Sequence, residues 1–167
     1  MDNVLVVWPK SENIVHINYH YTQFGESIDY LKKIFGDRIF SLDQDAQNLD
    51  TCEFIKDNNI KKVIMQVNYE NAKNAFEECN KIKSQNSIPV MAYGSIPIRF
   101  PNLFLDSKFD MIFKADGGDP EICMKSFINN YNEKEDTQIL QEKLMGATII
   151  RDNNFYDTMR WAIYSPR

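Results

Sequence analysis

Five short apolar runs, separated by segments with helical spacing, constrain the fold of this chain more than any other feature. The runs occupy residues 4–8, 38–42, 63–67, 88–92 and 110–113. Continuous apolar runs of this length are typical of parallel strands, because helices cover both faces of a parallel sheet. Strands that alternate with helices in this way predict an α/β fold with right-handed crossovers.

The segments between the runs predict the helices of this fold. We expect helices at residues 28–35, 47–58, 69–84, 102–108 and 121–131. Gly36 is suited to end the first helix, and Pro120 to begin the last one after Asp119 as its N-cap. We therefore predict a doubly wound, mostly parallel five-stranded sheet that is flavodoxin-like and Rossmann-like in architecture.

The C-terminal part of the chain follows a different pattern. Residues 132–136 form a charged linker, residues 137–145 have helical spacing, and residues 147–150 are strand-like. The aromatic stretch that follows has no clear period. We expect one α/β domain over residues 1–131 and a short C-terminal extension over residues 132–167. This extension either packs back on the sheet or connects to a further domain.

The charge of the chain argues against nucleic acid as a partner. Its 24 acidic and 19 basic side chains give a net charge of −5, and no basic face is encoded. The basic pairs at residues 32–33 and 61–62 are expected to be solvated surface. No apolar run reaches the roughly 20 residues that span a bilayer, and no signal peptide is recognised. We expect a cytoplasmic protein without membrane contact.

The spacing of the cysteines predicts no local metal site. Cys52, Cys79 and Cys123 lie far apart, and neither a CxxC nor a CxxxCxxC spacing occurs. We therefore expect neither a zinc site nor an iron–sulfur cluster in this chain. Each cysteine falls in an expected helix, where its ordinary role is that of a small buried apolar residue.

Four loops are candidates for a ligand site, because open α/β sheets bind ligands beyond the carboxyl ends of their strands. These loops occupy residues 8–25, 66–69, 93–101 and 114–120. Gly94 ends the fourth strand, where the backbone must turn sharply or approach a ligand closely. Gly117 and Gly118 lie in the turn between the fifth strand and the last helix.

The third and fourth loops carry a resemblance to a known family. The residues that carry it are IPVMAYGSIP at 88–97, Phe100-Pro101, FDMIFK at 109–114, and Gly117. They resemble the cobalamin-binding domain that precedes the catalytic barrel of cobalamin-dependent radical S-adenosylmethionine enzymes. The opening strand, which ends in Trp8-Pro9, is similar as well, and the resemblance covers residues 1–131.

Several positions depart from the patterns of cobalamin proteins. The sequence DGGD at residues 116–119 replaces a Gly-Glu-Gly-Glu-like turn, and Tyr93 stands where a second glycine is common. Cobalamin domains of mutases carry Asp-x-His-x-x-Gly, but here Asn18 precedes His20 and the glycine spacing fails. An asparagine orients an imidazole less strongly than a carboxylate does. The resembling radical enzymes commonly bind cobalamin without a histidine ligand.

The resemblance implies that the chain binds cobalamin beyond the carboxyl ends of the strands. The residues implied to contact the corrin ring are Pro9, Gly94, Ser95, Ile96 and Pro97. Gln66 and Asn68 are implied to offer hydrogen bonds to the side amides or the nucleotide tail, and Gly117 and Gly118 to leave room for it. His20 is the candidate for a lower cobalt ligand.

The resemblance also implies that the chain has no catalytic centre of its own. The family holds its iron–sulfur cluster with a CxxxCxxC motif, which this sequence lacks. We therefore expect a radical S-adenosylmethionine barrel to perform the reaction, such as a methyl transfer. That barrel would lie in cis after Arg167 or be supplied in trans by a partner.

Other uses of the same architecture fit the sequence less well. A phospho-receiver needs acidic residues after the first strand and an aspartate after the third, and neither occurs. A nicotinamide site needs Gly-x-Gly-x-x-Gly after the first strand, which is also missing. An acid–base site would have to pair His16 or His20 with Asp116 or Asp119.

A second hypothesis is a degenerate domain that has lost the cofactor and binds another protein. Its contact surface would be aromatic, since aromatic residues dominate interface hot spots. The candidates are Tyr19, Tyr21, Phe24, Phe100, Phe155 and Trp161. The two hypotheses differ in whether the crevice beyond Gly94 and Gly117 is open, or is filled by Tyr93 and residues 10–24.

Overall fold

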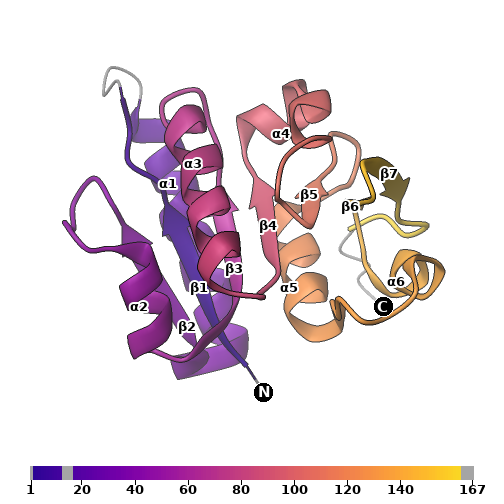
Figure 1. Ribbon diagram of the computed structural model, residues 1–167, viewed down its shortest axis with the longest axis horizontal. Coiled ribbons are helices and arrows are strands. Elements are labelled where there is room, and N and C mark those ends of the chain that lie inside the picture. Colours follow the sequence, from indigo (N-terminus) through magenta and orange to yellow (C-terminus); the bar gives the residue numbers. More distant parts are fainter. Residues whose placement is uncertain (1, 13–16, 163–167) are drawn as a thin grey trace.

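One sheet organises the protein, which we describe from a computed structural model over residues 2–12 and 17–162. Within these residues, seven strands pair in the order β2-β1-β3-β4-β5-β6-β7 (Figure 1). The strands are β1 (Asn3–Trp8), β2 (Ile39–Asp43), β3 (Ile60–Gln66), β4 (Val90–Tyr93), β5 (Met111–Phe113), β6 (Ala147–Arg151) and β7 (Asn154–Asp157). The first five are parallel, and β6 and β7 are antiparallel to their neighbours.

Helices cover both faces of this sheet. They are α1 (Ile17–Phe35), α2 (Thr51–Asp57), α3 (Ala72–Gln85), α4 (Ser95–Arg99), α5 (Pro120–Asn130) and α6 (Thr137–Lys143), with 3₁₀ turns η1 (Gly36–Arg38) and η2 (Pro101–Phe104). α1 and α5 pack against one face, and α2 and α3 against the other (Figure 1). The predicted doubly wound, mostly parallel α/β fold is confirmed, and the sheet has two strands more than the five predicted.

β1 shows why the sheet must be covered on both sides. Every residue from Val4 to Trp8 is fully buried. Val4, Val6 and Trp8 face the α1 layer, whereas the residues between them face α2 and α3. Burial of such a side chain contributes roughly 1.5–3 kcal/mol. A continuous apolar strand is therefore stable only at the centre of a sandwich of helices.

α1 begins earlier than the sequence predicted. It starts at Ile17, so residues 17–25 of the expected loop after β1 are helical. The apolar stripe of α1 comprises Tyr21, Phe24, Ile28, Leu31 and Phe35, all packed in or against the α1-side core. The stripe keeps its helical spacing through the polar sequence that led us to expect a loop.

The region expected as a loop at residues 94–101 also differs, because α4 and η2 form directly after β4. Gly36 adopts a φ of +64°, as expected for a residue that ends α1. Asp119 precedes α5 as predicted, but its side chain makes no cap hydrogen bond. Its backbone N–H instead donates to the carbonyl oxygen of Ala162 at 2.6 Å.

The C-terminal extension packs against β5 as far as Ala162. β6 pairs with β5, and isolated bridges join Gly118 to Ala162 and Met145 to Arg160. The backbones meet so closely that a Cβ on Gly117 would collide with the carbonyl group of Gly146. This extension therefore depends on glycine at the β5–α5 turn.

We predict that Gly117→Ala destabilises the protein by roughly 1–3 kcal/mol, the usual cost of forcing atoms into a packed interior. Urea unfolding measures the change. Gly25→Ala is the control, since Gly25 lies in α1 and a Cβ there meets no atom within 4 Å. That change should stabilise by about 0.5–1 kcal/mol. Equal effects of the two substitutions would contradict the close packing of the extension.

Candidate functional site

The carboxyl ends of β1, β3 and β4 lie side by side at one edge of the sheet. The strand order reverses between the parallel strands β1 and β3, because β2 is added on the far side of β1 whereas β4 and β5 are added on the far side of β3. Open α/β sheets bind ligands at this kind of position. In Figure 1 it is the upper edge, where β1 ends after rising from the N-terminus.

The turns after β3 and β4 touch each other through Gly94. Its φ is +120°, and a Cβ there would lie 2.6 Å from the carbonyl oxygen of Val67. Ser95 N–H donates to Asn68 Oδ1 at 2.8 Å, and Ile96 N–H donates to the Val67 carbonyl at 3.1 Å. The close approach predicted for Gly94 is thus made first to the protein's own backbone. Any side chain here would separate the two turns.

Asn71 fixes the shape of the turn after β3. Its Oδ1 accepts from the Asn68 N–H at 2.8 Å, and its Nδ2 donates to the Gln66 carbonyl at 3.0 Å. Asn71 is fully buried, and these two bonds pair its side chain with backbone groups at both sides of Val67. The turn is therefore held by one side chain that the sequence did not reveal as part of the site.

Gln66 points away from the edge and into the α1 layer. Its Oε1 accepts from the Tyr93 hydroxyl at 3.0 Å, and its Nε2 lies 3.2 Å from Gln23 Oε1. Burial raises the pKa of Tyr93, which is fully enclosed. Tyr93 therefore does not fill the crevice beyond Gly94, and the structure gives Gln66 an internal partner.

Asp45 anchors the segment that follows β1, and sequence reasoning missed it. Its carboxylate accepts from Trp8 Nε1 and the Tyr21 hydroxyl at 2.8 Å each, and from both the N–H and the hydroxyl of Ser11. Burial raises the pKa of Asp45, but these hydrogen bonds outweigh it and hold the pKa below its usual value. Trp8 also stacks on Tyr21, with ring centroids 4.5 Å apart.

The anchored segment then crosses from β1 to α3. Asn74 Nδ2 donates to the Lys10 carbonyl at 2.7 Å, and the Glu12 N–H donates to the Glu70 carbonyl at 2.8 Å. Residues 10–12 thus cover the point where the strand order reverses. The structure does not describe residues 13–16, which include His16.

His20 lies on α1 rather than in a loop, and it has a carboxylate partner. Its Nδ1 is 2.9 Å from Glu70 Oε1, and Glu70 comes from the turn after β3. The sequence had suggested only Asn18 as an orienting group. Carboxylates are the usual partners that orient a ligating imidazole. In the described part of the chain no group of three or more metal-binding side chains occurs, so a bond from His20 to cobalt stays a prediction.

Three buried polar atoms at this edge have no hydrogen-bond partner among the described residues. They are Asn68 Nδ2, Glu70 Oε2 and Ser95 Oγ. Asn68 is fully buried, and Glu70 is 8% exposed. Such unpaired groups are rare in folded proteins, because each costs about 1–3 kcal/mol. All three atoms lie in the adjacent turns after β3 and β4.

The glycines after β5 have a different neighbour from the one expected. The space beside Gly117 and Gly118 is taken by Gly146 and Ala162 of the C-terminal extension. The room that these glycines provide is therefore used by the chain itself. Gly118 is exposed on its other side, and its contact with a ligand stays a prediction.

A hollow of about 260 Å³ lies beside these glycines, between α4 and the strands β5 to β7. Its lining is Pro97, Ile98, Pro101, Asn102, Ile112, Lys114, Ala115, Asp116, Thr148, Phe155 and Asp157. Drug-sized ligands occupy pockets of about 300–1,000 Å³. The hollow is therefore large enough for part of a ligand. Asp116 lies here, whereas His20 pairs with Glu70, so the structure does not assemble the predicted acid–base pair.

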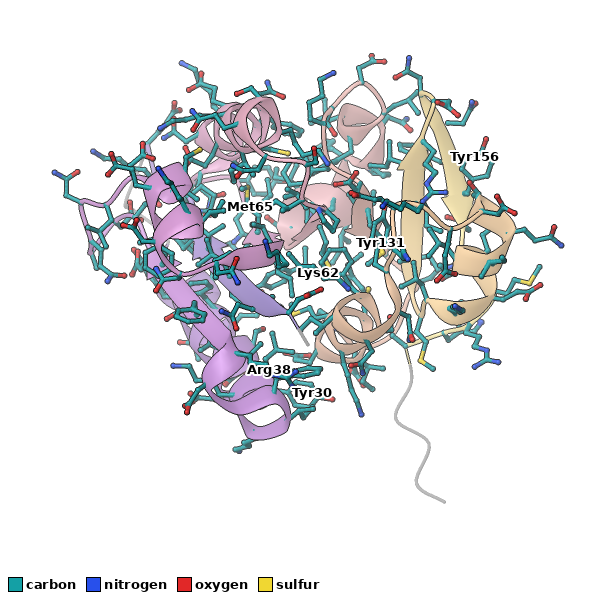
Figure 2. All side chains as sticks on the ribbon, turned by 60° about the horizontal axis from the view of Figure 1, so that its bottom comes forward. Tyr30, Arg38, Lys62, Met65, Tyr131 and Tyr156 are labelled. Carbon is teal, nitrogen blue, oxygen red and sulfur yellow. The ribbon has the colours of Figure 1, made fainter. Side chains whose placement is uncertain are left out.

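A larger hollow of about 1290 Å³ opens at the opposite edge, by the amino ends of the strands. Lys62 lines it and is buried, contrary to the expected solvated surface. Its Nζ donates to the carbonyl groups of Phe127 and Ile128 in the last turn of α5, at 3.0 and 2.7 Å. Figure 2 views this edge and shows Lys62 beside Tyr131.

The larger hollow is a weaker candidate because its buried charge already has a structural role. The carbonyl groups at the end of a helix lack partners within the helix and attract cations. Lys62 donates to two carbonyl groups at this end, of which that of Phe127 also accepts from the Tyr131 N–H, and burial lowers the pKa of Lys62. The unpaired polar atoms lie at the other edge, where ligands of α/β sheets bind.

The aromatic residues proposed as a contact surface differ in their exposure. Phe24 belongs to the core, Tyr21 packs against it, and Phe155 is half-buried. Phe100 and Trp161 are 46% and 52% exposed. The Tyr19 side chain lies outside the described residues. None of the described helices is both long and apolar enough to cross a bilayer.

Comparison with solved structures finds chains of similar fold. The structure is similar to the cobalamin-dependent S-adenosylmethionine radical enzyme OxsB, solved with aqua-cobalamin and S-adenosylmethionine bound and with aqua-cobalamin bound. Each comparison has a TM-score of 0.70 and 15% sequence identity, over 96% of this chain and 22% of that chain. The two proteins share a fold.

The resemblance predicted from the sequence is therefore confirmed for the fold. This chain spans 22% of the length of the enzyme that it matches. The sequence matches no protein-family model and no curated protein.

We predict that Tyr93→Phe destabilises the protein by about 1–3 kcal/mol, because it leaves the buried Gln66 Oε1 without its hydroxyl donor. Urea unfolding measures the change. Tyr69→Phe removes a hydroxyl from a side chain that is 55% exposed and should shift stability by less than about 0.5 kcal/mol. If both variants unfold alike, Gln66 does not depend on Tyr93.

Proposed function

We propose that this chain binds cobalamin at the carboxyl edge of its sheet, as the cofactor-binding part of a radical S-adenosylmethionine enzyme. The observation that carries this proposal is the group of unpaired polar atoms on Asn68, Glu70 and Ser95. They lie at the position where open α/β sheets bind ligands. The fold is shared with an enzyme solved with aqua-cobalamin bound.

The residues at this edge fit the chemistry of such a cofactor. Cobalamin carries carboxamide side chains, and Asn68 Nδ2 and Glu70 Oε2 offer a donor and an acceptor for them. Ile96 and Pro97 are buried at the start of α4, and Ile98 beside them is 38% exposed. An apolar wall with a few polar groups is typical of cofactor sites.

In this proposal Pro9, Gly94, Ser95, Ile96 and Pro97 contact the ring, and Asn68 holds its periphery. When bound, cobalamin supplies cobalt–carbon chemistry such as methyl transfer. The protein's part is to bind and orient the cofactor. A radical S-adenosylmethionine barrel in cis or in trans performs the reaction, and its presence accords with the 22% of the enzyme chain that this one matches.

The proposed site also suggests that cobalamin rests largely on the edge. Segment 10–12 covers the reversal point, and the hollow beside α4 holds about 260 Å³. A second protein surface would then cover the exposed side of the ring. We place this function in the cytoplasm, where the three unpaired, buried cysteines stay reduced.

Binding is tested by anaerobic titration with hydroxocobalamin and methylcobalamin, followed by gel filtration and visible absorbance. We predict that corrinoid co-elutes with the protein. We expect Ser95→Ala to weaken binding about three- to tenfold, because the buried hydroxyl group loses its ligand partner. Ser84→Ala is the control, since that hydroxyl is bonded to the Lys81 carbonyl on the surface. Absence of co-elution at high micromolar cobalamin would reject the proposal.

The same titration tests His20 as the lower cobalt ligand. A base-on spectrum that changes in His20→Ala would support this role. A base-off spectrum that is unchanged in the variant would show that cobalt has no ligand from His20. In the second case the pair of His20 and Glu70 serves to join α1 to the turn after β3.

A second candidate function is protein binding by a domain without cofactor. It is favoured by exposed apolar side chains in η2 and just before it, where Leu103 is 58% and Phe100 46% exposed. Phe100 also packs edge-on against Tyr69, with ring centroids 6.2 Å apart. Exposed apolar groups that lie together often mark contact surfaces. This function becomes the better proposal if the protein binds no corrinoid.

A further inference from the structure

The two carboxylate oxygens of Glu70 have different surroundings. Oε1 lies 2.9 Å from His20 Nδ1, whereas Oε2 is buried without a hydrogen-bond partner. An ionised carboxylate accepts hydrogen bonds and donates none. Oε2 is thus an acceptor that requires an N–H or O–H group from outside the described residues.

Asn68, two residues earlier in the same turn, has an unpaired donor where Glu70 has an unpaired acceptor. Its Oδ1 is used by the Ser95 N–H at 2.8 Å, which fixes which end of the amide carries the nitrogen. Its Nδ2 is buried and unpaired. The turn after β3 therefore contains one unsatisfied donor and one unsatisfied acceptor.

We infer that this turn selects corrinoids by their primary carboxamide groups and rejects forms in which a carboxylate replaces one of them. This inference rests on the proposed function. A primary carboxamide has both a carbonyl acceptor and N–H donors, so it suits Asn68 Nδ2 and Glu70 Oε2 alike. A carboxylate has no hydrogen to donate, so it leaves Glu70 Oε2 without a hydrogen bond. It also carries the same charge as Glu70, so the two groups repel each other.

The burial of Glu70 makes the selection strong. A site with a buried acceptor discriminates against an analogue without the matching donor, because the protein group then stays unpaired. Glu70 is bordered by segment 10–12, whose Glu12 N–H donates to the Glu70 carbonyl. The same segment is held to α3 by the hydrogen bond from Asn74 Nδ2 to the Lys10 carbonyl.

The experiment compares cobalamin with its three propionate-side-chain monocarboxylic acids, each with one amide hydrolysed. Affinities are measured by fluorescence quenching and gel filtration at about 0.5 M salt, where the general charge of −5 is largely screened. We expect at least one monoacid to bind at least about tenfold more weakly than cobalamin. Glu70→Gln keeps the shape and removes the charge, and it should reduce this difference below about threefold.

Glu12→Gln is the matched control. Glu12 is exposed at the same edge, with Lys73 Nζ 3.8 Å away, so its removal changes the net charge equally. The discrimination should persist in this variant. Asn68→Asp keeps the acceptor for the Ser95 N–H and removes the Nδ2 donor, so it should weaken binding of cobalamin itself. Urea unfolding of each variant confirms that it is folded.

The outcomes separate the inference from the function on which it rests. Equal binding of cobalamin and all three monoacids by the original chain would overturn the inference and leave cobalamin binding intact. Discrimination that survives in Glu70→Gln would overturn it as well. If the chain binds no corrinoid, the proposed function fails and the inference fails with it.

Discussion

The contact between the backbone of Gly94 and the carbonyl group of Val67 is the constraint on which the site depends. A Cβ at Gly94 would lie 2.6 Å from that oxygen, so only glycine lets the turns after β3 and β4 meet. Their contact brings the Asn68 side chain to the Ser95 N–H. It also places the unpaired atoms Asn68 Nδ2 and Ser95 Oγ in adjacent turns. The polar character of this edge therefore follows from backbone packing.

A second constraint acts on the other side of the reversal point. The Asp45 carboxylate accepts hydrogen bonds from Trp8, Ser11 and Tyr21. These bonds connect the segment after β1 to both the sheet and α1. Segment 10–12 then reaches the turn after β3 and α3. The hollow at this edge lies farther along the sheet, beside α4 and β5, and the C-terminal extension forms one of its walls.

The C-terminal extension gives the two glycines of the β5–α5 turn a structural role. Gly117 and Gly118 occupy a strand-to-helix turn, where glycine often makes room for a ligand. Here Gly146 and Ala162 occupy that room, and the extension adds β6 and β7 to the sheet. The same glycines thus serve the packing of the chain, which separates their structural role from any contact with a cofactor.

Much of the architecture could be predicted from local sequence, because continuous apolar runs such as Val4–Val7 are stable only between two layers of helices. The sequence also located the carboxyl-edge loops and the glycine that joins them. The predicted start of α1 was wrong. The apolar stripe through Tyr21 and Phe24 is present, but the polar residues between these positions obscured its helical period.

By itself, the sequence determined the alternation of strands and helices, since burial on both faces is a local property of each run. Only the tertiary structure decided the pairing of His20 with Glu70, 50 residues apart, and the anchoring of Trp8 by Asp45. It also decided which polar atoms stay unpaired. These features depend on which side chains from distant segments reach the same edge, and hydrogen bonds of this kind leave no periodic trace in the sequence.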